Sequence, residues 1–115
     1  MNAPAALFES SLSNLKLHAR GKVRDIYDVD ENHLLIVTTD RLSAFDVVLP
    51  NPIPGKGQVL TAVSNFWFDK MQNIIPNHLS TLTLEEVVPD ANERTQIEGR
   101  AIIVKKLKPL PVEAI

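Results

Sequence analysis

Two clusters of charged residues and one long loop hold most of the side chains that could take part in chemistry. The first cluster surrounds Gly21, where Arg20, Lys22 and Arg24 occupy alternate positions. Alternate side chains of a strand share one face, so a regular strand would project these three cations together. Glycine lets the backbone approach a phosphate closely. The alternative is a solvent-exposed edge strand whose cations discourage aggregation.

The second cluster lies at the end of the apolar run AIIVKKL (101–107). A lysine is costly to bury without a partner, so Lys105 or Lys106 should face a cleft or a counter-ion. A strand lysine of protein kinases faces the nucleotide phosphates in this way. Two exposed lysines at a fraying strand end account for the pattern equally well. Pro109 and Pro111 predict that a rigid, extended connector follows.

The loop from Thr39 to Gly57 is the third candidate, because a long loop rich in charged residues often binds ligands. Asp40, Arg41, Ser43 and Asp46 are suited to bind a polar substrate or to support a metal ion. The alternative is that Asp40 and Ser43 cap turns while Arg41 pairs locally. At the end of the loop, Lys56 stands between two glycines that would let the backbone approach a ligand. The spacing is not that of a Walker A loop.

Hydrophobic periodicity predicts an α+β fold, an antiparallel sheet with one main helix. We expect a short helix over 4–15, strand-like segments on both sides of Gly21, a turn at 28–32 and a buried strand over 33–39. Residues 50–57 should lack regular structure because they contain three prolines. The remaining elements are an amphipathic helix with one apolar face (Leu60, Val63, Phe66, Trp67, Met71, Ile74), a strand or irregular cover over 79–87, a loop over 89–99, and strands over 101–107 and from 112 onward. Phe66 and Trp67 should pack in the core rather than stack on a base. The apolar face of the helix is larger than a short sheet can bury, so we also expect a sizeable exposed apolar patch on these 115 residues.

Composition limits the classes of function. The net charge of −2 over 115 residues argues against a general nucleic-acid binder. The absence of cysteine excludes disulfides and thiolate metal sites, and the three histidines have no metal-ligand spacing. No signal peptide or membrane-length apolar run is present, so we expect a cytoplasmic protein. Because the chain ends at Ile115 inside an apolar segment, we expect residues 1–115 to be the N-terminal lobe of a longer protein.

From residue 15 onward the chain resembles the SAICAR synthetases, a family of purine-biosynthesis ligases. No single segment carries this resemblance; it depends on several segments in the same order. They are Gly21, Lys22, Arg24 and Tyr27; the run TDRLSAFD (39–46); Gly55 to Gly57; Asn65, Trp67 and Phe68; Ile97 to Arg100; Val104 and Lys106; and Val112 with Glu113.

The resemblance implies the small, ATP-binding lobe of a kinase-like fold. It also implies a reaction in which ATP activates the carboxylate of an aminoimidazole ribotide and the amine of L-aspartate then forms an amide. Magnesium would be held by acids beyond Ile115, and the ribotide-phosphate site would also lie there. Homo-oligomerisation remains open. The rival hypotheses are another kinase-like nucleotide enzyme and a non-catalytic interaction module.

The resemblance also implies roles for individual residues. By this analogy the ATP site would contain Gly21, Lys22, Val23, Arg24, Leu35, Val104, Lys106, Lys108, Pro109 and Leu110, with the last three at the hinge. The substrate side would contain Asp40, Ser43, Asp46 and Lys56. No catalytic residue and no metal ligand is assigned within these 115 residues.

Overall fold

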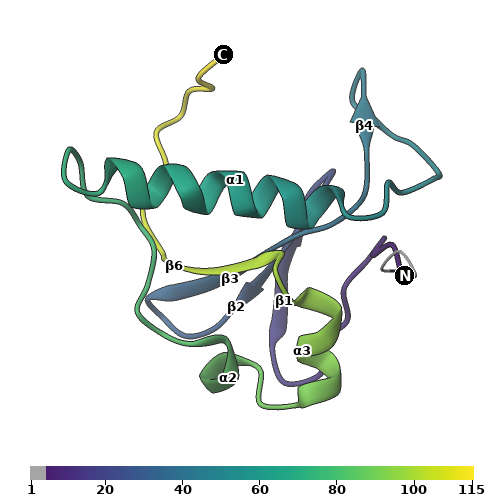
Figure 1. Cartoon of the computed structure of the whole chain (residues 1–115), viewed down its shortest axis with the longest axis horizontal. Coiled ribbons are helices and arrows are strands. Elements are labelled where there is room, and N and C mark those ends of the chain that lie inside the picture. Colours follow the sequence, from purple (N-terminus) through teal and green to yellow (C-terminus); the bar gives the residue numbers. More distant parts are fainter. Residues whose placement is uncertain (1–4) are drawn as a thin grey trace.

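A four-stranded antiparallel sheet with helices on both faces forms the centre of the computed structural model, which describes residues 5–115 (Figure 1). The predicted α+β class and the antiparallel meander are confirmed. The strands lie in the order β1-β2-β3-β6, so β6 joins the meander across a long connection. Their bounds are β1 Lys16–Arg20, β2 Arg24–Asp28, β3 His33–Thr38 and β6 Ala101–Lys105.

One face of the sheet, the closed face, carries the hydrophobic core. The register places Tyr27 opposite Leu35 and Leu35 opposite Ile103, so these side chains share that face. The N-terminal segment and two short helices, α2 (Leu84–Val87) and α3 (Ala91–Ile97), cover it (Figure 1). Leu35 and Ile97 are completely buried there.

The opposite face, the open face, carries Ile26, Ile36 and Ile102, which lie side by side in the same register. Helix α1 (Lys56–Met71) lies over this face (Figure 1) and buries only Gly57 and Thr61. The expected exposed apolar patch on this helix is confirmed, whereas the expectation that Phe66 and Trp67 pack in the core is wrong for the described residues.

The first turns of α1 make the contacts with the sheet. They contact mainly β3, and Leu60, Thr61 and Ser64 line a cavity together with Ile36 and Ile102. Farther along the helix, Phe66 and Trp67 are 55% and 54% exposed. The described residues thus bury the closed face in a core and leave the apolar face of α1 largely exposed.

The N-terminal helix predicted for 4–15 does not form over residues 5–15, and position 4 lies outside the described residues. Its backbone amides bond to distant side chains instead of to a preceding helical turn. The amides of Leu7, Ser10 and Ser13 donate to Asp40, Asp25 and Glu93 respectively. These tertiary bonds outweigh the apolar spacing that suggested a helix.

The connection between α1 and β6 contains the two short helices in place of the predicted strand or cover and loop. Thr83 and Glu86 form a reciprocal capping box at the start of α2. Asp90 caps α3 by accepting from the amides of Asn92 and Glu93, and Ile97 then inserts into the core. These caps were readable in the sequence and were missed.

Three other boundaries differ from the prediction. The strand expected over 101–107 ends at Lys105, and residues 112–115 are irregular rather than a strand. The prediction of irregular structure over 50–57 holds until α1 begins at Lys56. The preceding loop contains a two-stranded ribbon, β4 (Ser43–Ala44) and β5 (Val47–Val48).

In residues 5–115 no helix is long and apolar enough to cross a bilayer.

Replacing Gly57 with alanine should destabilise the protein even though alanine favours helices. The added Cβ would lie 2.1 Å from the carbonyl oxygen of Thr38, so the backbone would have to move. We expect a cost of about 3 kcal/mol, which exceeds the gain of about 1 kcal/mol in helix propensity. Thermal denaturation measures the change. Gly21→Ala is the control, because its nearest new contact is at 3.4 Å; equal melting temperatures for the two variants would contradict this reasoning.

Candidate functional site

The loop around Gly21 is held from below by the buried side chain of Arg41. Its Nε donates to the Lys22 carbonyl at 2.9 Å, and its Nη2 donates to the Gly21 carbonyl at 2.9 Å. Nη1 donates to the Phe8 carbonyl at 2.6 Å. The guanidinium therefore joins the N-terminal segment, the β1–β2 turn and the end of β3 in one network.

The charge of Arg41 is balanced by Asp25, which lies 2.9 Å away and is completely buried. Asp25 also accepts from the amide and hydroxyl of Ser10 and from Arg20. Burial acts to raise the pKa of Asp25, but the bonds from Ser10, Arg41 and Arg20 outweigh it and hold the pKa below its usual value. The cation pattern Arg20, Lys22, Arg24 is thereby broken, because Arg20 turns toward the closed face.

A second buried ion pair fixes the start of α1. Asp40 is completely buried and accepts from Arg100 Nη1 at 2.7 Å, from the Gly57 amide at 2.8 Å and from the Leu7 amide at 2.9 Å. Burial acts to raise its pKa, and these three donors together lower it below the usual value. Asp40 therefore has a structural role, and the expectation that it faces a substrate is wrong. The close backbone approach at Gly57 is likewise to the protein itself rather than to a ligand.

At the rim of the Gly21 loop, Lys22 forms an exposed ion pair with Asp46. Asp46 lies at the tip of the β4–β5 ribbon, where Phe45 and Asp46 both have positive φ angles, 51° and 63°. Two consecutive left-handed residues are typical of a tight hairpin turn. Phe45 is fully exposed. The tip rises on the same side of the sheet as α1 (Figure 1).

The sheet register corrects the predicted adenine pocket. Leu35 lies opposite Ile103, whereas Val104 lies opposite Leu34, so Leu35 and Val104 are on opposite faces. Leu35 is completely buried in the core and cannot contact a ligand while that core is intact. Val104 is on the open face and is 2% exposed. Strand alternation was visible in each segment, but the pairing between β3 and β6 was not.

The open face also gathers polar groups that the sequence prediction did not connect. Asp28 lies 3.0 Å from His18 Nδ1 and 3.4 Å from Lys106 Nζ. Lys106 is thus directed across the open face, although it lies just beyond β6 and is partly exposed. Lys105 is paired in register with His33, on the side of Ile103. Of the two lysines left open by the sequence, Lys106 is therefore the one on the face with α1.

The remaining predicted residues lie around this face without converging on one point. Val23 is half-buried in the Gly21 loop, and Arg24 lines a cavity between the sheet and α1 together with Ile36 and Thr38. Lys56 is the first residue of α1, and Ser43 begins β4. Lys108, Pro109 and Leu110 are exposed in an irregular connector after β6.

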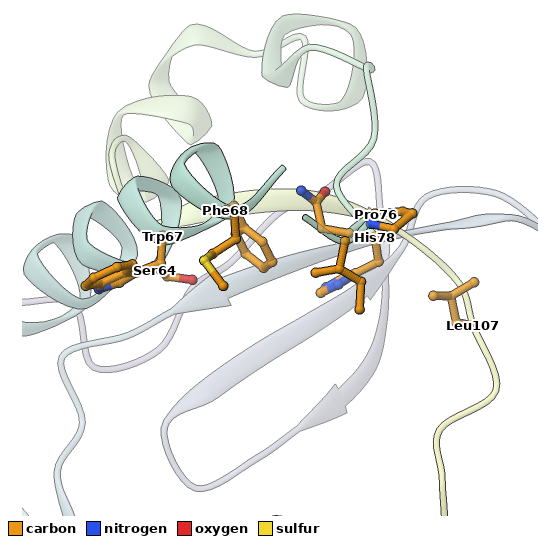
Figure 2. A pocket seen from close by; sticks show the side chains of 9 residues that line it. Ser64, Trp67, Phe68, Pro76, His78 and Leu107 are labelled. Carbon is orange, nitrogen blue, oxygen red and sulfur yellow. The ribbon is translucent and has the colours of Figure 1, made fainter. Parts of the chain in front are cut away.

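A larger cavity than the one beside Arg24 lies at the C-terminal end of α1. It has a volume of about 740 Å³ and is lined mainly by apolar side chains, including Trp67, Phe68 and Leu107 (Figure 2). It contains no side chain assigned above to phosphate or substrate. In the part of the chain that the structure describes, no three His or acidic side chains converge to hold a metal ion.

Acid should destabilise the protein steeply below about pH 4, the usual pKa of an aspartate in an unfolded chain. Folding lowers the pKa of both Asp25 and Asp40, so their contribution is present above that pH and is lost as the pH falls toward their folded values. Melting temperatures from pH 7 to pH 3 test this. Asp40→Asn should be less stable at pH 7 and lose less on acidification, whereas the exposed Glu31→Gln should follow the unmodified chain. If the melting temperature of Asp40→Asn fell with pH as steeply as that of the unmodified chain, Asp40 would not contribute to the acid sensitivity.

Known proteins match this chain along almost its whole length. The family model for SAICAR synthetase matches residues 17–115. A phosphoribosylaminoimidazole-succinocarboxamide synthase of Methylococcus capsulatus is 66% identical over 115 residues, covering all of this chain and 39% of that protein. The synthase of Nitrosomonas europaea is also 66% identical, over 113 residues, covering 98% of this chain and 38% of the relative.

Solved structures agree with the sequence comparisons. A SAICAR synthase superposes with a TM-score of 0.84 at 42% identity, covering 92% of this chain and 39% of that one. A SAICAR synthase from Saccharomyces cerevisiae complexed with SAICAR gives a TM-score of 0.80 at 43% identity, covering 88% of this chain and 37% of that one. The chain spans about two fifths of the length of these relatives. It belongs to the SAICAR synthetase family.

Proposed function

We propose that this chain is the nucleotide-binding lobe of an ATP-dependent ligase of purine biosynthesis. The parent enzyme would join L-aspartate to the carboxylate of 5-amino-1-(5-phosphoribosyl)imidazole-4-carboxylate, giving SAICAR, ADP and phosphate. The observation that carries this proposal is the match of the chain to phosphoribosylaminoimidazole-succinocarboxamide synthases. One SAICAR synthase that it matches was solved in complex with SAICAR.

The proposed reaction has two steps. The carboxylate oxygen of the ribotide attacks the γ-phosphorus of ATP, which releases ADP and leaves an acyl phosphate. The amine of aspartate then attacks the acyl carbon, phosphate leaves, and an amide forms. Charge neutralisation and positioning are the main tasks of a protein in such a reaction.

The open face and the rim of the Gly21 loop are where we place the nucleotide. Lys22, Arg24 and Lys106 lie there, and none of the three is buried. Lys22 would exchange its exposed partner Asp46 for phosphate, since an exposed ion pair contributes little to stability. Val23, Leu34 and Ile36 offer half-buried apolar surface near these cations. Leu34 and Ile36 replace the buried Leu35 in the proposal.

The other assignments keep the status of proposals. Lys108, Pro109 and Leu110 would form the hinge toward a larger lobe, as in kinase-like folds. Ser43, Asp46 and Lys56 would lie on the substrate side. Magnesium would be held by acids outside these 115 residues; among the described residues no three His or acidic side chains converge on one point.

The first test is the reaction of the full-length protein. ADP should form only when the carboxylated ribotide is present, and the succinocarboxamide should form when aspartate is added as well. A coupled ADP assay with product detection by mass spectrometry measures both. ADP formation with an unrelated acceptor and none with the ribotide would overturn the proposal.

The second test uses the neighbouring lysines. Lys106→Met in the full-length enzyme should lower kcat/KM for ATP by roughly tenfold or more, because a hydrogen bond from a charged group to phosphate is lost. Lys105→Met should leave it unchanged, since Lys105 lies on the opposite side of the strand register. If both proteins fold and the two substitutions have equal effects on kcat/KM for ATP, the proposed role of Lys106 in phosphate binding is wrong.

A further inference from the structure

We infer that Arg41 is a positioning residue that orients the backbone amides of the Gly21 loop toward a phosphate. This inference rests on the proposed function, because it assumes that the anion is the phosphate chain of a nucleoside triphosphate. Arg41 itself does not touch the ligand. It is 3% exposed and lies beneath the loop, bonded to the protein on every side.

The carbonyl groups of the Gly21 loop point toward Arg41. Arg41 Nη2 donates to the Gly21 carbonyl and Nε donates to the Lys22 carbonyl, both at 2.9 Å. A third, longer bond at 3.3 Å goes to the Arg24 carbonyl. The carbonyls at both ends of the turn and within it therefore point inward, toward one buried cation.

The described chain has no cis peptide bonds, and in a trans peptide the N–H points opposite to the preceding C=O. The amides of Lys22 and Val23 follow the Gly21 and Lys22 carbonyls, so they point away from Arg41. In residues 5–115 neither amide has a hydrogen-bond acceptor. Successive amides directed outward in this way are a favourable site for an anion.

The Gly21 amide donates to the Arg24 carbonyl at 2.7 Å and closes the turn. The Val23 carbonyl accepts from both the amide and the hydroxyl of Thr39, at 3.0 and 2.7 Å. Thr39 and Arg41 thus hold the loop at consecutive points from the end of β3. The amides are oriented before a ligand arrives, which reduces the ordering cost of binding.

A buried guanidinium with no partner would be too costly, and Asp25 at 2.9 Å neutralises it. The attraction for phosphate therefore comes mainly from the outward amides and from Lys22 at the rim. This separates the role of Arg41 from that of an arginine that binds phosphate directly. Its removal should weaken binding of the phosphates and leave binding of the adenosine part intact.

The matched pair of substitutions is Arg41→Lys and Arg94→Lys in the full-length protein. Arg94 also donates to two backbone carbonyls, those of Val88 and Pro89, both at 2.9 Å, but it lies on α3 far along the chain from the loop. Lysine keeps the charge in both variants and loses the planar set of donors. Any general effect of replacing a carbonyl-binding arginine should appear in both.

Titration calorimetry with ATP and with adenosine measures the effect. For Arg41→Lys we expect the ratio of ATP to adenosine affinity to fall by roughly tenfold, the loss expected from about one or two hydrogen bonds. For Arg94→Lys the ratio should equal that of the unmodified enzyme. A purely structural role of Arg41 would lower both affinities together. An unchanged ratio in Arg41→Lys, or an equal fall in Arg94→Lys, would overturn the inference.

A measurement on the unmodified protein covers the case in which Arg41→Lys does not fold. With ¹⁵N-labelled lysine and valine, ATP should shift the amide resonances of Lys22 and Val23, and adenosine should not. If ATP binds and these resonances stay in place, the inference is wrong. If they shift while the ribotide-dependent ligase assay fails, the loop binds phosphate and the proposed reaction is wrong instead.

Discussion

The buried pair of Asp25 and Arg41 is the interaction on which the rest of the structure depends. Asp25 lies on the closed face of the sheet and Arg41 follows β3, yet their contact also holds Ser10 and the Gly21 turn. Removing one partner of such a pair leaves an unpaired buried charge, at a cost of about 3–5 kcal/mol. The contact between Asp25 and Arg41 therefore stabilises the core and also fixes the conformation of the Gly21 loop, where we propose that phosphate binds.

Asp40 and Arg100 repeat this arrangement one step further along the chain. Their contact ties the second residue after β3 to the residue before β6, and the Gly57 amide brings the first turn of α1 to the same carboxylate. The motif resemblance covered Asp40, Arg41, Gly57 and Arg100, and all four turn out to hold backbone segments together. Three charged motif residues, Asp40, Arg41 and Arg100, thus act from inside the protein, whereas Lys22, Arg24 and Lys106 are exposed and are the cations that we propose for the ligand.

Much of the fold was predictable because local patterns determine it. Strand alternation and the turn at 28–32 gave the meander, and the periodicity of the long helix gave α1. The errors arose where contacts distant in the sequence decide the outcome. The N-terminal segment bonds to Asp25 and Asp40 rather than to itself, and the face on which Leu35 lies follows from its pairing with Ile103. For the proposed site, the family resemblance implied the Gly21 loop and Lys106, and these assignments stay predictions; the position of Arg41 beneath the loop depends on distant contacts that the sequence could not indicate.

The division of the sheet into a closed and an open face has a consequence for how the sequence can change. Neighbouring positions in β3 serve different purposes: Leu35 and Val37 fill a completed core, while Leu34 and Ile36 face α1 and the proposed ligand side. A substitution on one face of the sheet does not require a second substitution on the other face, because adjacent side chains of a strand do not share neighbours. Substitutions at every second residue of β3 can therefore change ligand recognition while the buried residues that stabilise the fold stay the same.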